Sequence, residues 1–299
     1  MLVNRGRLIF HITKEAVDEW EEKQKTGKRG APKIFTDAAI ETALTIREYF
    51  GLDLRGTEGV VATMLATLGT SCNAPDYTTL SKRGRAITVD IRVRKKTSNE
   101  PLHLVVDSSG FKVYGEGEWK VRQHGVSKRR TWKKLHLGGD AKNGDIEVAL
   151  MTENDVHDST VLPEILRNIP TDMAIADVAG DGAYDTRSCY DAIGAHNARA
   201  LIPPRKDAKI MRHGNKTGVP HPRDTNLRRI RKIGRARWKD ESGYHKRSRS
   251  ENTFFRLKTL FGDRLASRTK SNQRTELLLR VKLLNRFTLL GMPESYIVE

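Results

Sequence analysis

Cysteine is scarce in this chain of 299 residues. Its two cysteines, Cys72 and Cys189, lie far apart and outside any Cys-x-x-Cys spacing, which argues against a disulfide framework and against a cysteine zinc site. No apolar run approaches the roughly 18 residues that span a bilayer. The first residues contain no small-residue cleavage site of a signal peptide. We therefore expect a soluble intracellular protein with no membrane partner.

Aromatic residues are also few, at 6% of the chain, whereas positive charge is in excess, with a net charge of +17. Residues 1–96 carry 17 basic and 12 acidic side chains (+5), residues 97–200 carry −4, and residues 201–299 carry 25 basic and 9 acidic side chains (+16). Charge that serves solubility alone is expected to be spread more evenly. The uneven distribution favours a polyanionic partner, although charge by itself does not separate DNA from RNA or an anionic membrane.

Residues 1–96 are predicted to form a helical DNA-binding region. Apolar periodicity and breaker residues indicate helices over about 13–22, 37–50, 55–68 and 76–87, with Thr36 as a cap and Gly51 as a stop. A helix, a turn and then a polar, basic helix is typical of a helix-turn-helix that reads the major groove. In that interpretation the DNA contacts come from Tyr77, Thr78, Lys82 and Arg83. The alternative is plain helix packing.

Residues 97–299 are predicted to form a mixed α/β sheet with flanking helices. Strand patterns occupy about 102–107, 110–115, 131–140 and 144–152, with a hairpin turn at Asn143–Gly144. Helices over 159–168 and 186–196 then alternate with strands over 173–177 and 200–203. Residues 204–240 form a basic insertion of irregular appearance with 13 basic side chains, and helices over about 246–261 and 273–290 follow.

Several carboxylates in this region are candidate metal ligands. Asp107 follows the apolar run LHLVV, so it is expected at the end of a buried strand. A carboxylate there costs free energy unless it is paired or binds a metal, the simpler alternative being a turn cap. Asp177, Asp181 and Asp185 follow within nine residues, and a metal would explain why such a cluster is tolerated. Spacing alone does not choose among the three.

The segment GYHKRSRSENTFFRLKTLFG is the most informative. On a continuous α-helix, Tyr244, Arg247, Glu251 and Lys258 fall within a sector of about 60°. Phe254, Leu257 and Phe261 form an adjacent apolar stripe that can anchor the helix. One face therefore presents a carboxylate among three groups that can hold phosphate. The alternative is a solvated basic face with one balancing acid.

The spacing Tyr-x2-Arg-x3-Glu-x6-Lys resembles the signature of a group of bacterial insertion-sequence transposases with a DDE triad. The resemblance is especially close to the group that includes the insertion sequence of the kanamycin transposon. It extends to VVDSSGFKVYGEGEWKVRQHG around Asp107, DGAYDTR at 181–187, LIPPR at 201–205 and the ending LLNRFTLLGMP. It covers most of the chain from about residue 25. The N-terminus is shorter than in these relatives, so some end-recognition sequence is expected to be missing.

The resemblance implies an RNase H-like fold and a bacterial, cytoplasmic and nucleoid-associated protein. It implies that Asp107, Asp181 and Glu251 are the catalytic metal ligands, with Asp181 preferred to Asp177, for Mg²⁺ or for Mn²⁺ as a substitute. The expected reaction is cleavage of double-stranded DNA at the terminal inverted repeats, followed by strand transfer into target DNA. Because two transposon ends must meet, we expect a homodimer in the active complex.

Further residues are predicted to contact DNA beside this site. Tyr244, Arg247 and Lys258 should position the phosphate backbone near the cut. The basic-aromatic stretch that follows Asp107 contributes His124, Arg129, Arg130 and Trp132.

Two rival functions share these features. One is a non-catalytic repressor that occupies transposon ends, which an intact triad argues against. The other is an RNase H-like nuclease that cuts without joining, and it would use the same residues.

Overall fold

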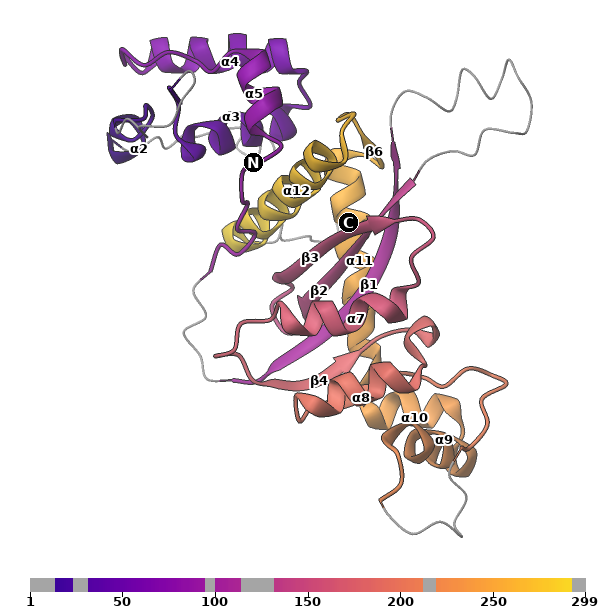
Figure 1. The fold of residues 1–299 in the computed structure, drawn as a ribbon. Coiled ribbons are helices and arrows are strands. Elements are labelled where there is room, and N and C mark those ends of the chain that lie inside the picture. The colour runs from indigo at the N-terminus through magenta and orange to yellow at the C-terminus, as the bar shows by residue number, and fades with distance from the viewer. Residues whose placement is uncertain (1–13, 24–31, 95–99, 114–131, 212–218, 292–299) are drawn as a thin grey trace, which may run out of the picture. The chain divides into compact units, whose positions relative to one another are not determined.

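The computed structural model describes residues 14–23, 32–94, 100–113, 132–211 and 219–291 (Figure 1). The chain divides into two compact units, Met1–Val89 and Asp90–Glu299. Each unit is described by itself below.

The first unit consists of helices around a small core. They are α2 (Lys14–Asp18), α3 (Asp37–Phe50), α4 (Leu54–Thr67) and α5 (Tyr77–Arg83). Helix α3 begins where the sequence predicts, because the Thr36 hydroxyl accepts a hydrogen bond from the Ala39 N–H at 3.2 Å. It ends at Gly51, which has the left-handed φ of 64° that glycine adopts at helix ends. Helices α3, α4 and α5 contact one another pairwise, which confirms the helical N-terminal region.

The second unit is built on a mixed sheet of six strands. They are β1 (Leu102–Val113), β2 (Trp132–Asp140), β3 (Ile146–Glu153), β4 (Ile175–Ala179), β5 (Arg199–Leu201) and β6 (Arg264–Leu265). Five of them follow the order β3-β2-β1-β4-β5, and β6 pairs with the far end of β1. β1, β2 and β3 are antiparallel, whereas β4 and β5 run parallel to β1. This mixed sheet flanked by helices is RNase H-like, as predicted.

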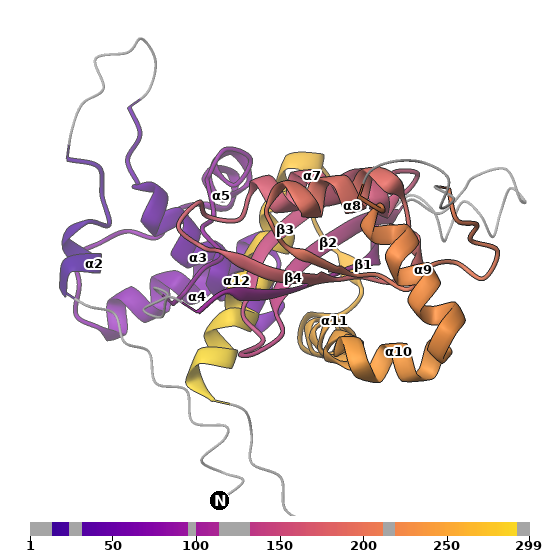
Figure 2. The ribbon, with the colours of Figure 1, turned by 90° about the horizontal axis from the view of Figure 1, so that it is seen from below.

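Helices cover both faces of this sheet. α7 (Asp158–Arg167) and α8 (Arg187–Ala195) lie on one face, and α11 (Ser248–Phe261) lies on the other, as Figure 2 shows. The main apolar core lies under α7 and α8, where Leu104 and Val106 of β1 meet Leu162 and Ile165 of α7. α12 (Lys270–Leu290) packs against β3 and α11. Within the described ranges, no helix has the length and apolar character needed to cross a membrane.

Three local predictions were wrong. The two strands expected over 102–107 and 110–115 are one strand, β1, because Ser108 and Gly110 continue the pairing with β2. The insertion at 204–240 is not irregular throughout, since it contains α9 (Pro222–Ile233) and most of α10 (Arg235–Ser242). The helix predicted over about 246–261 is α11 (Ser248–Phe261), but the continuous helix assumed to include Tyr244 was wrong: Tyr244–Arg247 form a 3-10 turn, η2, directly after Gly243 in the left-handed region (φ 74°).

Candidate active site

Asp107 lies on β1, and Asp181 lies two residues after the end of the neighbouring parallel strand β4, close enough for its charge to act on the Asp107 carboxyl. The β1–β4 pairing places Val105 beside Ala179, and each aspartate follows two residues later. Side chains two residues apart on a strand share a face, and neighbouring strands lie about 4.8 Å apart. The two carboxylates are therefore neighbours on the face of the sheet that α11 covers. Asp107 lies in the middle of β1 rather than at a strand end, because β1 continues along β2 and β6.

The Asp107 carboxylate is largely enclosed, with 17% of its side chain exposed. Its Oδ1 accepts the Ser108 N–H at 2.9 Å, and its Oδ2 accepts the Ser250 hydroxyl at 3.0 Å. Burial raises the pKa of Asp107, and the negative charge of Asp181 adds to this effect. The Ser108 N–H, the Arg247 charge and the Ser250 hydroxyl oppose the rise in pKa. A bound cation would relieve the same cost.

The two aspartates that compete with Asp181 have other partners. Asp177 is buried and lies 2.9 Å from His103 Nδ1 and 3.6 Å from an Arg199 nitrogen. Asp185 is also buried and accepts two hydrogen bonds from the Arg223 guanidinium, at 2.7 and 3.0 Å. Asp181 instead caps the 3-10 turn η1 (Gly182–Tyr184) through the Ala183 N–H at 2.9 Å. Of the three, Asp181 is the one whose negative charge contributes to the raised pKa of Asp107.

Glu251 is linked to Asp107 through Arg247. Arg247 Nη1 lies 3.0 Å from Glu251 Oε1, and its Nη2 lies 3.6 Å from Asp107 Oδ2. The Glu251 side chain is 63% exposed, so it lies toward solvent while Arg247 lies inside. The buried Nε of Arg247 has no hydrogen-bond partner within the described part of the chain. One guanidinium thus holds two of the three predicted acids.

Tyr244 and Lys258 flank these groups. Tyr244 is buried in η2, its ring centroid lies 6.1 Å from that of Trp238, and burial raises the pKa of its phenol. The η2 turn contacts both β1 and β4. Lys258 donates to the Ser109 hydroxyl at 2.7 Å, two residues beyond Asp107 on the same face of β1. Both side chains therefore approach the Asp107 strand, although Tyr244 does so from a 3-10 turn and not from the predicted helix.

The donors at this site suit a hard divalent cation. Asp107 and Asp181 offer carboxylate oxygens, which Mg²⁺ prefers. Among the described residues, however, no three Asp, Glu, His or Cys side chains are grouped closely enough to hold a metal ion. The pair Asp107–Asp181 fits such an ion, and Glu251 is the acid held apart by Arg247.

Ser250 is a site residue that the sequence argument missed. It is buried, and its hydroxyl donates to Asp107. Ser250 stands on the same helical stripe as Phe254 and Leu257, which are buried as predicted. A small polar residue on that stripe was the available signal. Phe261, the third stripe residue, is only partly buried.

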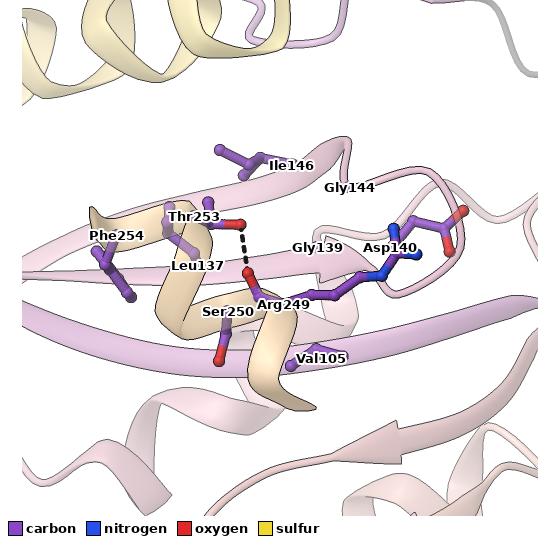
Figure 3. Close-up of a pocket in the computed structure, with 10 residues that line it drawn as sticks. All are labelled: Val105, Leu137, Gly139, Asp140, Gly144, Ile146, Arg249, Ser250, Thr253 and Phe254. Atoms are coloured by element: carbon purple, nitrogen blue, oxygen red, sulfur yellow. Dashed lines mark hydrogen bonds between the residues drawn. The ribbon is translucent and has the colours of Figure 1, made fainter. Parts of the chain in front are cut away.

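Ser250 also lines a pocket between the start of α11 and the β2–β3 hairpin (Figure 3). Its walls are largely apolar and include Val105, Leu137, Ile146 and Phe254. Arg249 lies along its rim and donates to the Lys142 carbonyl at 2.9 Å. The pocket adjoins the Asp107 site but offers no cluster of ligands of its own.

Four further residues were predicted to contact DNA near the site, and the structure describes one of them, Trp132. Trp132 pairs with Lys112 across β1 and β2, so it faces the side of the sheet opposite to Asp107. It packs against Gly110 and under the Lys112 ammonium. The structure therefore does not bring Trp132 together with the acids. His124, Arg129 and Arg130 lie outside the described residues.

The four residues predicted to read DNA from the first unit all lie on α5. Tyr77, Thr78 and Lys82 are exposed. The Thr78 hydroxyl bonds to Asp76, and this contact and those of Thr79 hold the pKa of Asp76 far below its usual range. Arg83 points inward, donating to the Phe35 carbonyl at 2.7 Å and pairing with Asp37. Arg83 therefore stabilises this unit through contacts within it.

Two protein-family models match this chain. A family model described as "Transposase DDE domain" matches residues 98–286, more than half of the chain, and a second model of the same description matches residues 3–116. The chain belongs to the DDE transposase family.

Among solved structures, the chain is similar to the Mos1 transposase paired-end complex with left transposon end. That match has 11% identity, a TM-score of 0.24, and covers 89% of this chain and 82% of that one. The Mos1 mariner paired end complex with Mn matches with 12% identity, a TM-score of 0.25, and the same two coverages. TM-scores of this size are too low to establish a shared fold, so the assignment of this DDE family member rests on the family match.

Proposed function

We propose that this protein is a DNA transposase that cleaves DNA at the ends of an insertion sequence and joins the freed ends to target DNA. One observation carries the proposal: the Asp107 and Asp181 carboxylates interact, each two residues after the paired Val105 and Ala179, and Arg247 links Asp107 to Glu251. Two neighbouring carboxylates with a third acid held nearby by Arg247 are suited to the metal ions that phosphodiester chemistry uses.

Asp107, Asp181 and Glu251 would hold Mg²⁺, or Mn²⁺ in its place. Bound in pairs, such ions activate the attacking oxygen and stabilise the leaving oxygen at the phosphate. The chain's own residues prepare this site. Ser250 and the Ser108 N–H orient Asp107, and Ala183 orients Asp181.

Cationic groups around the acids bind the DNA backbone near the cut. Lys258 reaches Ser109 on the Asp107 face, and its ammonium suits a phosphate oxygen. Arg247 has a guanidinium fork that suits a phosphate, and it lies beside Asp107 with 19% of its side chain exposed. Tyr244 lies close to Arg247, since the Arg247 charge acts on the pKa of its phenol.

We place the protein in the Tyr-Arg-Glu-Lys group on the spacing of Tyr244, Arg247, Glu251 and Lys258. Its partners are the terminal inverted repeats and a target duplex, and its active form is a homodimer that joins two ends. We propose a helical DNA-binding region over residues 1–96 and a catalytic domain over 97–299, in a bacterial, nucleoid-associated protein. In the first region, exposed Tyr77, Thr78 and Lys82 on α5 are the candidate base-reading residues.

The test incubates the full chain with labelled transposon-end DNA, target plasmid and Mg²⁺. The expected result is a joined product that disappears with a chelator and in the variants Asp107→Asn, Asp181→Asn and Glu251→Gln, with DNA binding retained. Cleavage without joining would support a nuclease, and binding without cleavage by the wild type would support a repressor. If the three variants all cut normally, the triad assignment is wrong.

A further inference from the structure

The basic insertion of the second unit contains a helical hairpin, formed by α9 and α10. Within 222–242 it has eight basic and three acidic side chains. Gly234, with a φ of 84°, makes the turn between the two helices. The Arg229 guanidinium closes the hairpin on Glu241, with a shortest distance of 2.7 Å. The excess positive charge is thus carried by an ordered element.

This hairpin is fixed to the strands and loops of the catalytic site. Arg223 makes a two-pronged ion pair with Asp185, four residues after Asp181. Asn226 donates to the Ala200 carbonyl at 3.1 Å, and Arg235 donates to the Pro204 carbonyl at 2.6 Å. Trp238, the buried residue of α10, lies against Tyr244. The hairpin therefore presents its outer surface at a defined place beside the acids.

Three cations stand exposed on that outer surface. Arg231, Lys232 and Arg237 are exposed, and none of them lies within ion-pair distance of a carboxylate in the described ranges. The charge of Arg237 acts on Glu241, but the close partner of that carboxylate is Arg229. α10 contributes Trp238 to the interior and leaves most of its other side chains toward solvent. Because α10 buries only Trp238 among its described side chains, formation of the apolar core does not account for this helix.

We propose that Arg231, Lys232 and Arg237 form a binding surface for the phosphate backbone of duplex DNA. This inference rests on the proposed function and adds a second DNA contact, located on the catalytic unit itself. We assign the surface to the backbone because its three side chains are cations, and the hairpin's one amide side chain, Asn226, is used to anchor it. About half to two-thirds of the hydrogen bonds between proteins and DNA go to phosphate and sugar, with arginine and lysine among the main donors, and these contacts set the position along the duplex.

The experiment measures the binding of full-length protein to a random-sequence duplex as a function of salt. The triple variant Arg231→Gln, Lys232→Gln, Arg237→Gln should show a slope of log affinity against log salt that is smaller by roughly 2 to 3, since each phosphate contact contributes about 0.9. Its melting temperature should stay that of the wild type because the three side chains are exposed.

The matched control removes the same charge from α7 and from the region of α12, with Arg167→Gln, Arg268→Gln, Arg274→Gln, all exposed. The control should keep the wild-type slope. Equal slopes for the wild type and the hairpin variant, or an equal decrease in the control, would overturn the inference. Failure of the proposed function is a separate result: the wild type would not cut transposon-end DNA in Mg²⁺, whatever the two slopes are.

Discussion

The two faces of the catalytic sheet differ in the side chains that β1 places on them. Leu102, Leu104 and Val106 point toward α7 and α8 and are fully buried among apolar side chains. The alternate residues, which include His103, Asp107 and Ser109, point toward α11. A single strand therefore sends core residues to one face and reactive groups to the other, because its side chains alternate.

The polar face is held together by pairing rather than by apolar burial. Asp177 is matched by His103 and Arg199, Asp107 by Arg247, and Ser109 by Lys258. Pairing of this kind mainly offsets the desolvation of the charges and adds little net stability. We infer that the α7/α8 face supplies most of the stability and that the α11 face supplies the chemistry. The following predictions test this division, from the largest expected effect to the smallest.

The largest effects are expected when Asp181 and Asp177 are replaced one at a time. One replacement should affect the cleavage rate and the other the stability of the fold. Asp181→Asn should slow DNA cleavage on the order of 10³-fold or more, because a metal ligand is lost. Its stability should hold, since Asn can accept the same Ala183 N–H. Asp177→Asn should keep cleavage and lower the melting temperature, because His103 and Arg199 lose their partner. The test measures the cleavage rate and the melting temperature of both variants. Normal cleavage by Asp181→Asn together with slow cleavage by Asp177→Asn would show that Asp177, and not Asp181, is the metal ligand.

Truncating a side chain of the apolar face should lower stability and leave the cleavage rate unchanged. Ile165 of α7 is fully buried, and Ile165→Ala should reduce the free energy of unfolding by about 2–5 kcal/mol. Cleavage per folded molecule should not change, because the acids lie across the sheet. Urea unfolding together with active-site titration measures both quantities. The control is Glu164→Ala, a truncation of the exposed neighbouring residue. Slower cleavage by Ile165→Ala without a loss of stability would contradict the assignment of stability to the α7/α8 face and of chemistry to the α11 face.

A buried histidine should make the apolar face sensitive to acid. His136 has no exposed side-chain surface, and burial lowers its pKa to about 4 from 6.5. As pH falls, the unfolded chain takes up this proton first, so stability is complete above about pH 6.5 and is lost down to about pH 4. The loss amounts to roughly 3 kcal/mol.

His136→Phe should remove that part of the pH dependence in urea unfolding between about pH 7 and about pH 4.5. The variant also loses the hydrogen bond between Nε2 and the Thr152 hydroxyl (2.8 Å), which lowers stability at every pH. His196→Gln, at an exposed histidine, is the control and should keep the wild-type profile. Parallel profiles for His136→Phe and the wild type would refute the effect.

The smallest effect is expected at Ser250. Ser250→Ala removes a hydrogen bond to the Asp107 carboxylate and should slow cleavage roughly tenfold, since such bonds contribute about 1.5–3 kcal/mol. Ser250→Thr keeps the hydroxyl and should restore the rate. Ser248→Ala, on the same helix but exposed, is the matched control. A Thr variant as slow as the Ala variant would mean that packing, and not the hydroxyl, matters.

Local patterns predicted the main elements well. The helix of Asp37–Phe50 has the predicted cap and stop, and Phe254 and Leu257 anchor α11 as their spacing indicated. Patterns failed where pairing partners are distant. The polar Ser108–Gly110 stretch looked like a break, but it is held as strand by β2, more than twenty residues later in the chain. The sequence argument placed Tyr244 on the α-helix, but Tyr244 lies in the 3-10 turn that follows Gly243, and the α-helix begins at Ser248.

The sequence by itself determined the class of this protein: alternating strands and helices, an excess of positive charge toward the C-terminus, and the spacing of Tyr244, Arg247, Glu251 and Lys258. These are local properties of the chain, so they can be recognised without its three-dimensional structure. Only the tertiary structure decided which acids are neighbours. Asp177 and Asp185 are paired with His103 and Arg223, residues 74 and 38 positions away, whereas Asp181, just after the end of β4, acts on the Asp107 carboxyl of the neighbouring strand. The three aspartates of one short segment differ in this way because their partners come from elsewhere in the fold.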